Sequence, residues 1–478
     1  MAGDLSRLSH TCKRDDMSDQ PRLGPPAAPQ NLTDLAQGGA QGVLPGEVQV
    51  VIVGGGIMGL ATAWHLARRG RQVVLLDKGA LGGEQSGRAW GFVRQQDREP
   101  PELPLMVAAN RMWPGLAAEL GTDLEWRQEG LVALASTEEA LAHYEARVKI
   151  EREHGVDSRL LNGAQARALL PGISIPLLGG LHTPTDGHAH AMRATLAFAA
   201  AAQRAGARLY AHTAVDRLVT SAGRITGVAT TRGEIKAEVV ICATGAHSAR
   251  LLAGVGVSLP LRNTRSTVAL TPPLPPITGL AVRGPRVSFR QAPNGQVLLG
   301  RSGSSAADYD ITLEAFQHLG YFLPNFWKNR ELLNLRMGKP LLADLWRALP
   351  VTPAGLRARA HPFAHTVDLE PPPNQRTVAA LRRDFMACYP HLGDVAIERH
   401  WAGVIDTTPD IMPVIGPAPE REGLLIAAGF SGHGFALGPI VGKLLAEWVI
   451  TGKPSLDLHA FRLTRFAEGK TAPARKLH

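Results

Sequence analysis

The stretch that decides the fold is VQVVIVGGGIMGLATAWHLARRGRQVVLLD, residues 48–77 of a 478-residue chain. Its first six residues are Val or Ile except for Gln49, which is typical of a strand buried on both faces. Residues 60–69 predict a helix with small and apolar side chains on one face, and Gly70 ends it. Residues 72–77 predict a second buried strand, so the stretch indicates a βαβ unit.

Gly54, Gly56 and Gly59 form a GxGxxG pattern between the predicted strand and the predicted helix. In such a turn the first glycine permits the tight bend, the second lets backbone amides reach a pyrophosphate, and the third lets the helix pack closely on the strand. Asp77 ends the second strand, where a carboxylate can accept hydrogen bonds from ribose hydroxyls. A purely structural glycine turn would not require this acid, so the pattern predicts a dinucleotide site.

Two further segments favour FAD over a nicotinamide cofactor. The loop GALGGEQSGRAWG, residues 79–91, offers Ser86 and Arg88 to a pyrophosphate or to the edge of an isoalloxazine ring. The segment AAGFSGHGFALGP, residues 427–439, joins a predicted strand to a predicted helix. The N-terminus of that helix would stabilise the negative charge that a reduced flavin carries at N1 and C2=O, which a nicotinamide enzyme does not need.

Three separated motifs carry a resemblance to a known family. They are the βαβ stretch, ATGAHS at residues 243–248, and the segment that runs from VIDTTPDIMPVIGP at residues 404–417 to SGHGF at residues 431–435. In this order they resemble the D-amino-acid oxidase superfamily of FAD-dependent oxidoreductases over about residues 48–466. The likeness is greatest to the branch of monomeric sarcosine oxidase, sarcosine oxidase β-subunits and D-amino-acid or hydroxyproline dehydrogenases.

The resemblance implies an α/β fold with a discontinuous Rossmann-like FAD-binding domain and a substrate domain of antiparallel β-sheet and helices. The FAD-binding domain is expected at residues 48–97, 186–258 and 400–466, and the substrate domain at residues 98–185 and 259–399. Residues 1–47 are rich in Pro, Gly, Gln and Asp and lack an apolar period, so we expect a disordered extension. Residues 467–478 are expected to form a basic tail.

Within the predicted substrate domain, local patterns predict further elements. Residues 104–120 and 137–154 predict helices, and residues 124–135 predict two short strands around Gly130. The turn Pro293-Asn294-Gly295 predicts a β-hairpin.

Residue by residue, the resemblance implies FAD contacts at the positions that match the motifs of the family. These are Gly54, Gly56, Gly59, Asp77, Lys78, Ser86, Arg88, Val215, Gly245, Gly429, Ser431, Gly432 and Gly434. An acid at Asp77, in place of a basic residue, also disfavours a cofactor with a 2′-phosphate. Relatives that attach FAD covalently use a cysteine whose position matches Gly403, so we expect non-covalent FAD.

Two residues are candidates for catalysis. Arg94, in GFVRQQ, resembles the position at which sarcosine oxidases hold the substrate carboxylate, and a bidentate guanidinium suits that task. A surface or cofactor-contacting arginine is the alternative. His433, in SGHGF, should border the flavin and contact the substrate or handle a proton, and the alternative is a histidine that only bonds to backbone.

Two departures from the family pattern bear on the substrate and on the electron acceptor. Ala436 stands where monomeric sarcosine oxidases have a lysine that binds the carboxylate, which disfavours sarcosine itself. Oxygen activation in that branch depends on a lysine, and between residues 256 and 345 the chain has only Lys328 and Lys339, neither of which fits. We therefore expect a dehydrogenase more than an oxidase, with a quinone or a carrier protein as acceptor and O2 as the alternative.

The remaining polar residues of interest favour structural roles. The spacing of three histidines matches no metal site and predicts a polar loop without metal: His182, His188 and His190. Relatives usually carry an acid where His190 stands. Trp401, Asp406 and Asp410 are expected to be structural, with a place for Trp401 in the pocket wall as the alternative.

Composition and charge exclude several classes of protein. With 45% hydrophobic residues the chain is globular, and its uncharged apolar runs are strand-sized, so no transmembrane helix is expected. The net charge of +9 is spread thinly and aromatic residues make up 5%, which disfavours nucleic acid but permits peripheral contact with anionic lipids. Cys12, Cys242 and Cys388 form no CxxC, which favours a reducing compartment and hence the cytoplasm.

These observations support one functional hypothesis and leave two alternatives. The first is FAD-dependent oxidation of a C–N bond, by hydride transfer to flavin N5, in a small amino acid, an N-substituted amino acid or an imino acid, giving an imine. The second is a flavoprotein that acts on or binds tRNA. The third is an electron-transfer subunit of a heteromeric dehydrogenase.

Overall fold

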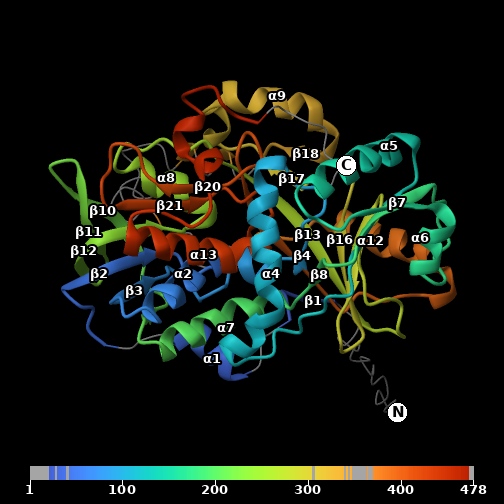
Figure 1. Ribbon diagram of the computed structural model, residues 1–478, viewed down its shortest axis with the longest axis horizontal. Coiled ribbons are helices and arrows are strands. Elements are labelled where there is room, and N and C mark those ends of the chain that lie inside the picture. The colour runs from blue at the N-terminus through green and yellow to red at the C-terminus, as the bar shows by residue number, and fades with distance from the viewer. Residues whose placement is uncertain are drawn as a thin grey trace, which may run out of the picture.

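The computed structural model describes residues 21–26, 30–38, 42–303, 307–338, 341–342, 345–346, 363 and 370–472. Two large sheets organise the chain, one of eight strands and one of eleven, and a small sheet pairs β4 (Phe92–Val93) with β8 (Gly187–His188). Figure 1 shows the two large sheets on opposite sides of the molecule, with helix α4 (Leu103–Leu120) between them. The α/β fold class expected from the sequence is therefore confirmed.

The eight-stranded sheet, termed the nucleotide-type sheet, contains both strands of the predicted βαβ unit. Its strands are β2 (Glu47–Val53), β3 (Val73–Leu76), β9 (Arg208–Tyr210), β10 (Val215–Ser221), β11 (Arg224–Thr230), β12 (Gly233–Cys242), β20 (Val414–Pro417) and β21 (Leu424–Ala428). The order is β10-β11-β12-β2-β3-β9, and β21 and β2 both run parallel to β12. The strands of this sheet thus come from three distant parts of the sequence. Parallel neighbours need long crossover connections, so strands that are far apart in the sequence can lie side by side.

Helices cover both faces of this sheet. On one face lie α2 (Ile57–Ala67), α7 (Ala191–Arg204), α13 (Gly434–Thr451), α4 and α1 (Gln30–Gly38), which share one apolar core. Helix α8 (Ser248–Ala253) packs on the opposite face. Of the described residues, α13 is the one helix long and apolar enough to cross a membrane, but 61% of it is buried inside the protein. It carries Lys443 and Glu447 and packs on α2 and α4, as a core helix does.

The eleven-stranded sheet is mostly antiparallel. Its strands are β1 (Arg22–Leu23), β5 (Leu131–Ala135), β6 (Arg159–Asn162), β7 (Gly179–Thr183), β13 (Arg262–Pro273), β14 (Ala281–Arg283), β15 (Val287–Gln291), β16 (Gln296–Arg301), β17 (Ala307–Asp310), β18 (Leu333–Arg336) and β19 (Arg399–Thr407). Helices α5 (Glu138–Glu153), α6 (Gly163–Leu169) and α12 (Gln375–Cys388) cover it, and α9 (Leu319–Asn329) lies apart from them (Figure 1). Strand β19 also shows that residue 400, an expected domain border, lies inside a strand of this sheet.

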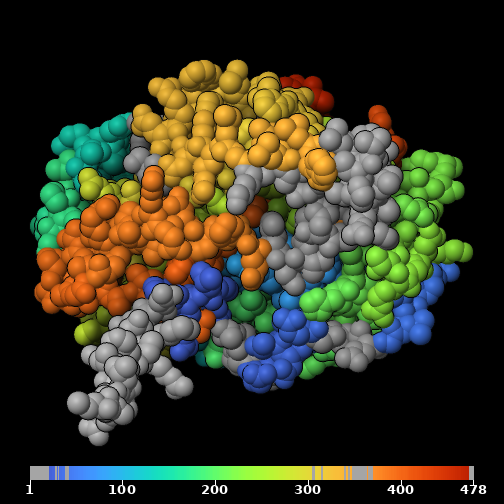
Figure 2. Space-filling view, turned by 180° about the vertical axis from the view of Figure 1, so that it is seen from behind, coloured from blue at the N-terminus to red at the C-terminus, as the bar shows by residue number. Residues whose placement is uncertain are grey.

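Short helical turns connect these elements. They are α3 (Gln85–Arg88) and the 3₁₀ turns η2 (Pro100–Glu102), η3 (Gly245–His247), η4 (Leu313–Phe316), η5 (Arg330–Leu332), η6 (Pro390–Leu392), η7 (His459–Phe461) and η8 (Leu463–Arg465). Figure 2 shows the reverse face of the molecule, which is hollowed between strands β10–β12 (green) and the segment that follows residue 370 (orange).

The expectation of disorder over residues 1–47 is wrong for the part of that segment that the structure describes. Leu32 and Ala36 of α1 are buried against the helices of the nucleotide-type sheet, and the carbonyl of Ala36 accepts the amide of Leu81. Strand β1 pairs with β19 in the larger sheet. A helix this short is stabilised by tertiary packing, which its polar composition does not reveal.

Most of the other predicted elements are confirmed. The helices expected at residues 104–120 and 137–154 are α4 and α5, and the expected hairpin is β15–β16. The expectation of two strands over residues 124–135 is wrong, because only β5 forms there. Arg127 makes only an isolated antiparallel bridge with His188.

Candidate functional site

A cavity of about 400 Å3 is lined by residues from both large sheets. Most of the candidate residues lie in its wall: Gly54, Gly56, Asp77, Lys78, Ser86, Arg88, Arg94, Val215, Gly245, Ser431, Gly432, His433 and Gly434. Gly59 and Gly429 do not line it. Residues up to about 380 positions apart in the sequence are therefore brought to one site.

The glycine turn between β2 and α2 has the geometry that the pattern predicts. Gly54 has a φ of +111°, and a Cβ there would lie 2.3 Å from the carbonyl oxygen of Ala243. A Cβ on Gly59 would lie 2.0 Å from the carbonyl oxygen of Gly54, so this glycine lets the helix approach the strand. A Cβ on Gly56 would meet only Ser86 Oγ, at 3.0 Å, and would otherwise project into the cavity.

Asp77, which directly follows β3, holds the glycine turn by hydrogen bonds to backbone amides. Its Oδ2 accepts the amide of Gly55 at 2.6 Å, and its Oδ1 accepts the amide of Gly79 at 2.8 Å. Burial raises the pKa of this carboxyl to about 6, although the two amides oppose the rise. The carboxylate lies in the cavity wall, where its remaining lone pairs can accept hydroxyl groups.

Ser86 and Arg88, in α3, bond to elements of the two large sheets and their covering helices: Ser86 bonds to the start of α2 and Arg88 bonds to β19. Ser86 Oγ accepts the amide of Ile57 at 2.9 Å and so caps the first turn of α2. Arg88 is 7% exposed and donates to the carbonyl oxygens of Gly83 at 3.0 Å and Ala402 at 3.2 Å. The sequence predicts cofactor contacts for both residues; the structure places both in the cavity wall and shows that each also bonds to the chain itself.

Lys78 forms an ion pair with Glu84, whose other oxygen lies 3.4 Å from His247 Nε2. Burial raises the pKa of Glu84, but the hydrogen bond and charge of His247, together with Lys78, lower it to about 2.

Gly245 begins η3 with a φ of +50°, and a Cβ there would lie 2.0 Å from Gln85 Oε1. Val215, at the start of β10, is 5% exposed. This part of the wall is thus charged near Lys78 and closely packed elsewhere.

The loop from Gly429 to Gly434 begins helix α13. Gly429 has a φ of +71° and donates its amide to Asp406 Oδ2 at 2.7 Å. Ser431 is in the left-handed region at +50° and donates its amide to the carbonyl of Asp406 at 3.0 Å. Because Asp406 fixes this loop, the amides at the N-terminus of α13 are presented to the cavity, where they favour a negatively charged group.

Arg94 and His433, the two predicted catalytic residues, line the same cavity. Arg94 Nη1 donates to the carbonyl of Gln96 at 2.5 Å, and burial lowers the pKa of the guanidinium. His433 Nδ1 lies 3.0 Å from Glu102 Oε1. Burial, and then the charge of Arg98, lower the pKa of His433 to about 4.

Three residues of this region are missing from the sequence-based prediction: Arg98, Glu102 and Arg283. Arg98 and Arg283 line the cavity, and Glu102, which is 0% exposed, bonds to His433. Arg98 follows Arg94 by four positions and Glu102 follows Arg98 by four, so a search for charged residues around Arg94 could have found both. No sequence signal marks Arg283, because it reaches the site through the pairing of β14 with β5 and with β15.

Several other residues considered in the sequence analysis do not line the cavity. His190 caps α7 by accepting the amide of Arg193 at 3.3 Å, and His188 bonds to the carbonyl of Gly279. Lys328 is in α9, and Lys339 lies outside the described residues. Ala436 is buried in α13, and its carbonyl accepts Trp113 Nε1 at 3.0 Å.

The three residues expected to be structural have structural partners. Trp401 donates its indole N–H to the carbonyl of Arg88 at 3.2 Å. Asp410 forms a buried two-point ion pair with Arg465, at 2.8 and 2.9 Å. Asp406 supports the loop before α13 and also lies in the cavity wall.

A glycine turn that opens on a cavity, together with an acid at the end of β3 and a second helix N-terminus, fits a dinucleotide and defines a dinucleotide-dependent enzyme. The chain belongs to the DAO family of FAD-dependent oxidoreductases, whose model matches residues 49–448. The residues present fit this cofactor, because a Cβ on Gly56 would occupy the space that backbone amides leave open.

Relatives of known activity cover most of the chain. A glycine oxidase of Geobacillus kaustophilus is 28% identical over 425 residues, covering 87% of this chain and 96% of the relative. The human mitochondrial sarcosine dehydrogenase is 26% identical over 92% of this chain, which spans only 44% of that longer protein. Among solved structures, the L-amino acid deaminase of Proteus myxofaciens in complex with anthranilate has a TM-score of 0.82 at 27% identity, covering 90% of this chain and 95% of the other.

Proposed function

We propose that the protein oxidises the C–N bond of a small amino acid, an N-substituted amino acid or an imino acid to an imine. The observation that carries this proposal is that one cavity contains both the glycine turn and a group of arginines with a histidine. The family supports this proposal, and so do the similar proteins, which include a glycine oxidase, a sarcosine dehydrogenase and an L-amino acid deaminase. FAD, when bound, supplies an acceptor for the two electrons that leave the substrate.

The residues of this chain would hold the cofactor by backbone amides and by the acid of β3. The amides around Gly54 and Gly56, at the N-terminus of α2, are suited to a pyrophosphate, and Asp77 to ribose hydroxyls. The N-terminus of α13 favours negative charge in the same cavity. Gly403 offers no nucleophile, which supports non-covalent binding.

The arginines and His433 would bind and orient the substrate. A guanidinium binds a carboxylate through two parallel hydrogen bonds, and Arg94 offers such a group in the cavity wall. The lowered pKa of His433 keeps its ring neutral at pH 7, so the ring can accept a hydrogen bond from the substrate amine. The substrate loses two electrons and two protons, and the imine then takes up water to give an oxo compound and either ammonia, from a primary amino acid, or an amine, from an N-substituted one.

The acceptor that reoxidises the enzyme belongs to the same proposal. Lys328, in α9, is not in the cavity wall, which supports a dehydrogenase that passes electrons to a quinone or a carrier protein. Comparing reoxidation by O2 with reoxidation by a soluble quinone analogue tests this part. Reoxidation that is faster with O2 at equal concentration contradicts it.

The function itself is tested by anaerobic reduction of the flavin. The FAD-loaded protein is mixed with D- and L-amino acids, N-methyl amino acids and imino acids, and its absorbance in the flavin band is followed. At least one member of the panel should bleach the flavin. If none does, or if only RNA perturbs the spectrum, the proposed amine oxidation is wrong.

A further inference from the structure

Arg98 is a buried arginine whose guanidinium makes no ion pair with the described residues. It is 2% exposed, lines the cavity, and its Nη1 has no hydrogen-bond partner. Among the described residues no carboxylate lies within ion-pair distance of it, and its Nε makes only a 3.4 Å contact with the carbonyl of Arg94. A buried guanidinium that lacks a partner is costly, so its presence in a cavity wall points to an anionic ligand.

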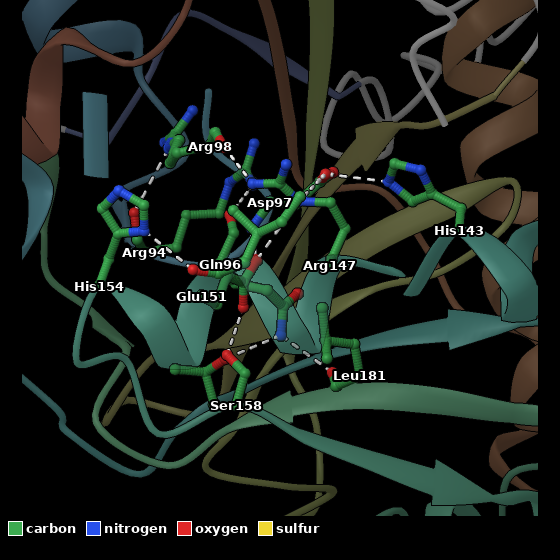
Figure 3. Close-up of polar contacts among 12 residues, drawn as sticks. Arg94, Gln96, Asp97, Arg98, His143, Arg147, Glu151, His154, Ser158 and Leu181 are labelled. Carbon is green, nitrogen blue, oxygen red and sulfur yellow. Dashed lines mark hydrogen bonds and ion pairs between the residues drawn. The ribbon is translucent and has the colours of Figure 1, made fainter. Parts of the chain in front are cut away.

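The two acids that act most on Arg98, Glu102 and Asp97, are hydrogen-bonded to other groups. Asp97 Oδ1 lies 3.0 Å from His143 Nε2, and Asp97 Oδ2 lies 3.0 Å from Arg283 Nη1. Figure 3 shows His143 on one side of Asp97 and Arg98 on the other. Arg147 lies 3.7 Å from the same carboxylate. Asp97 is therefore engaged by three cationic or polar groups and makes no ion pair with Arg98, although its charge still acts on that guanidinium.

The same network fixes the backbone that carries Arg98. The carboxylate of Glu151 accepts the amide of Asp97 at 2.6 Å and the hydroxyl of Ser158 (Figure 3). Asp97 has a φ of +58°, a conformation that costs a non-glycine residue free energy and persists because its surroundings impose it. Arg147 also donates to the carbonyl of Arg98. The orientation of Arg98 is thus built before any ligand binds, which lowers the entropic cost of binding.

Glu102 connects this arginine to His433. Glu102 is fully buried, and its two oxygens lie 3.0 and 3.1 Å from His433 Nδ1, although the two residues are 331 positions apart. Burial raises the pKa of the Glu102 carboxyl, but the contact with His433 and the charges of Arg98 and Arg94 lower it below its usual value, so Glu102 is ionised at pH 7. A carboxylate only accepts hydrogen bonds, so Nδ1 carries the proton and Nε2 of the neutral ring is an acceptor.

We propose, on the basis of the proposed amine oxidation, that Arg98 binds the substrate carboxylate and that Glu102 fixes the His433 tautomer whose Nε2 accepts a hydrogen bond from the substrate amine. Arg98 then acts as a binding residue alongside Arg94, and Glu102 as a positioning residue that acts through His433. Together they orient both ends of an α-amino acid with residues from a single short segment and from the N-terminus of α13.

Substrate binding would also change the electrostatics at His433. The charged groups that act on its ring are Arg98 and Arg94, which lower its pKa, and Glu102, which raises it. A substrate carboxylate placed on the two arginines offsets their charge and leaves Glu102 dominant. The ring therefore becomes a better hydrogen-bond acceptor when the substrate is in place, and binding is coupled to orientation of the amine.

The role of Arg98 is tested by binding, without turnover. Anthranilate and its amide, 2-aminobenzamide, differ by one charge, and each is titrated into the FAD-loaded protein while the flavin spectrum is followed. Arg98→Met should raise the Kd of anthranilate by about 10- to 100-fold, with little change for the amide, and Arg98→Lys should fall between Met and wild type. Arg204→Met is a matched control, because Arg204 bonds to the carbonyl of Leu120 outside the cavity.

If Arg98→Met retains its FAD and its thermal stability and still prefers anthranilate over the amide, the inference is wrong. The same holds if wild type binds the two probes equally well. Because this titration needs no substrate, it decides the role of Arg98 even if no amine reduces the flavin and the proposed function fails.

The role of Glu102 is tested by separating binding from rate. Glu102→Gln can donate to Nδ1 and so permits the opposite tautomer of His433. The Kd of anthranilate should stay within about twofold of wild type, whereas the limiting rate of anaerobic flavin reduction should fall by at least about 10-fold. The pH profile of that rate should change as well, because the charge beside His433 is lost. An unchanged rate and pH profile in a folded, FAD-loaded Glu102→Gln would overturn the assignment.

Discussion

Alanine at Gly56 and alanine at Gly59 should separate the two tasks of one glycine turn. Gly56 has ordinary extended backbone, with φ −77° and ψ 178°, and an added Cβ would meet only Ser86 Oγ at 3.0 Å before it projects into the cavity. An added Cβ on Gly59 would lie 2.0 Å from the carbonyl oxygen of Gly54. The first substitution should therefore affect the ligand, and the second should affect the fold.

The structure sets the size of each effect. Gly59→Ala brings a carbon more than about 1 Å inside normal contact with main-chain oxygen, so α2 must move away from β2, at a cost of about 1–3 kcal/mol in the free energy of unfolding. Gly56→Ala needs only a shift of Ser86 by a few tenths of an ångström, so the apo-protein should lose less than about 1 kcal/mol. Loss of one charge-assisted amide contact with the pyrophosphate should weaken FAD binding by roughly 10- to 100-fold.

Two assays on the same variants separate these effects. Urea unfolding of the apo-proteins gives the free energy of unfolding, and quenching of FAD fluorescence on titration gives the Kd. Gly46→Ala is the control, because no heavy atom lies within 4 Å of a Cβ added there. The reasoning is refuted if Gly56→Ala binds FAD as tightly as wild type, or if Gly59→Ala is as stable as wild type.

Three further predictions follow from the site. Arg94→Ala should raise the KM for the amino acid at least about 10-fold while FAD stays bound, and unchanged kinetics would remove Arg94 from the substrate site. Asp77→Asn can accept only one of the amides of Gly55 and Gly79, so its FAD Kd should rise about 10-fold, which flavin titration can contradict. Asp186 is fully buried behind the segment that carries Arg94 and accepts the backbone amides of Gln95 and Gln96. Burial raises the pKa of Asp186 to about 6, so the stability that its protonation favours is present below about pH 4 and is lost as pH rises to about 6. The unfolding free energy of Asp186→Asn relative to wild type should therefore rise by up to about 3 kcal/mol over that window in urea unfolding, and a difference that does not change with pH would contradict the raised pKa of Asp186.

The glycine turn could be predicted from the sequence because its constraints are local. Gly54 needs a positive φ and Gly59 needs to lack a Cβ, and both requirements are visible in a strand–GxGxxG–helix pattern. The loop before α13 is a similar case, since Gly429 and Gly432 both adopt positive φ. Arg94 and His433 could be placed in the cavity because family motifs mark them.

The features of the fold and the site that could not be predicted from the sequence depend on contacts between residues far apart in the chain. Glu102 bonds to His433 across 331 positions, and no local pattern encodes that pair. Helix α1 is short and polar, so its sequence resembles that of a disordered segment, and it is stabilised by packing on α7 and by the hydrogen bond between Ala36 and Leu81. Ser86 shows a third limit, because a serine in a cofactor loop can cap α2 and still lie in the cavity wall.

A single-turnover reduction tests the central claim most directly. The FAD-loaded protein is mixed without oxygen with the amine that bleaches it fastest, in its ordinary form and with deuterium on the α-carbon, and the flavin absorbance and the oxo product are measured. We predict complete bleaching, one oxo product formed per flavin, and clearly slower bleaching with the deuterated substrate. A flavin that no carboxylate-bearing amine can bleach would contradict the account.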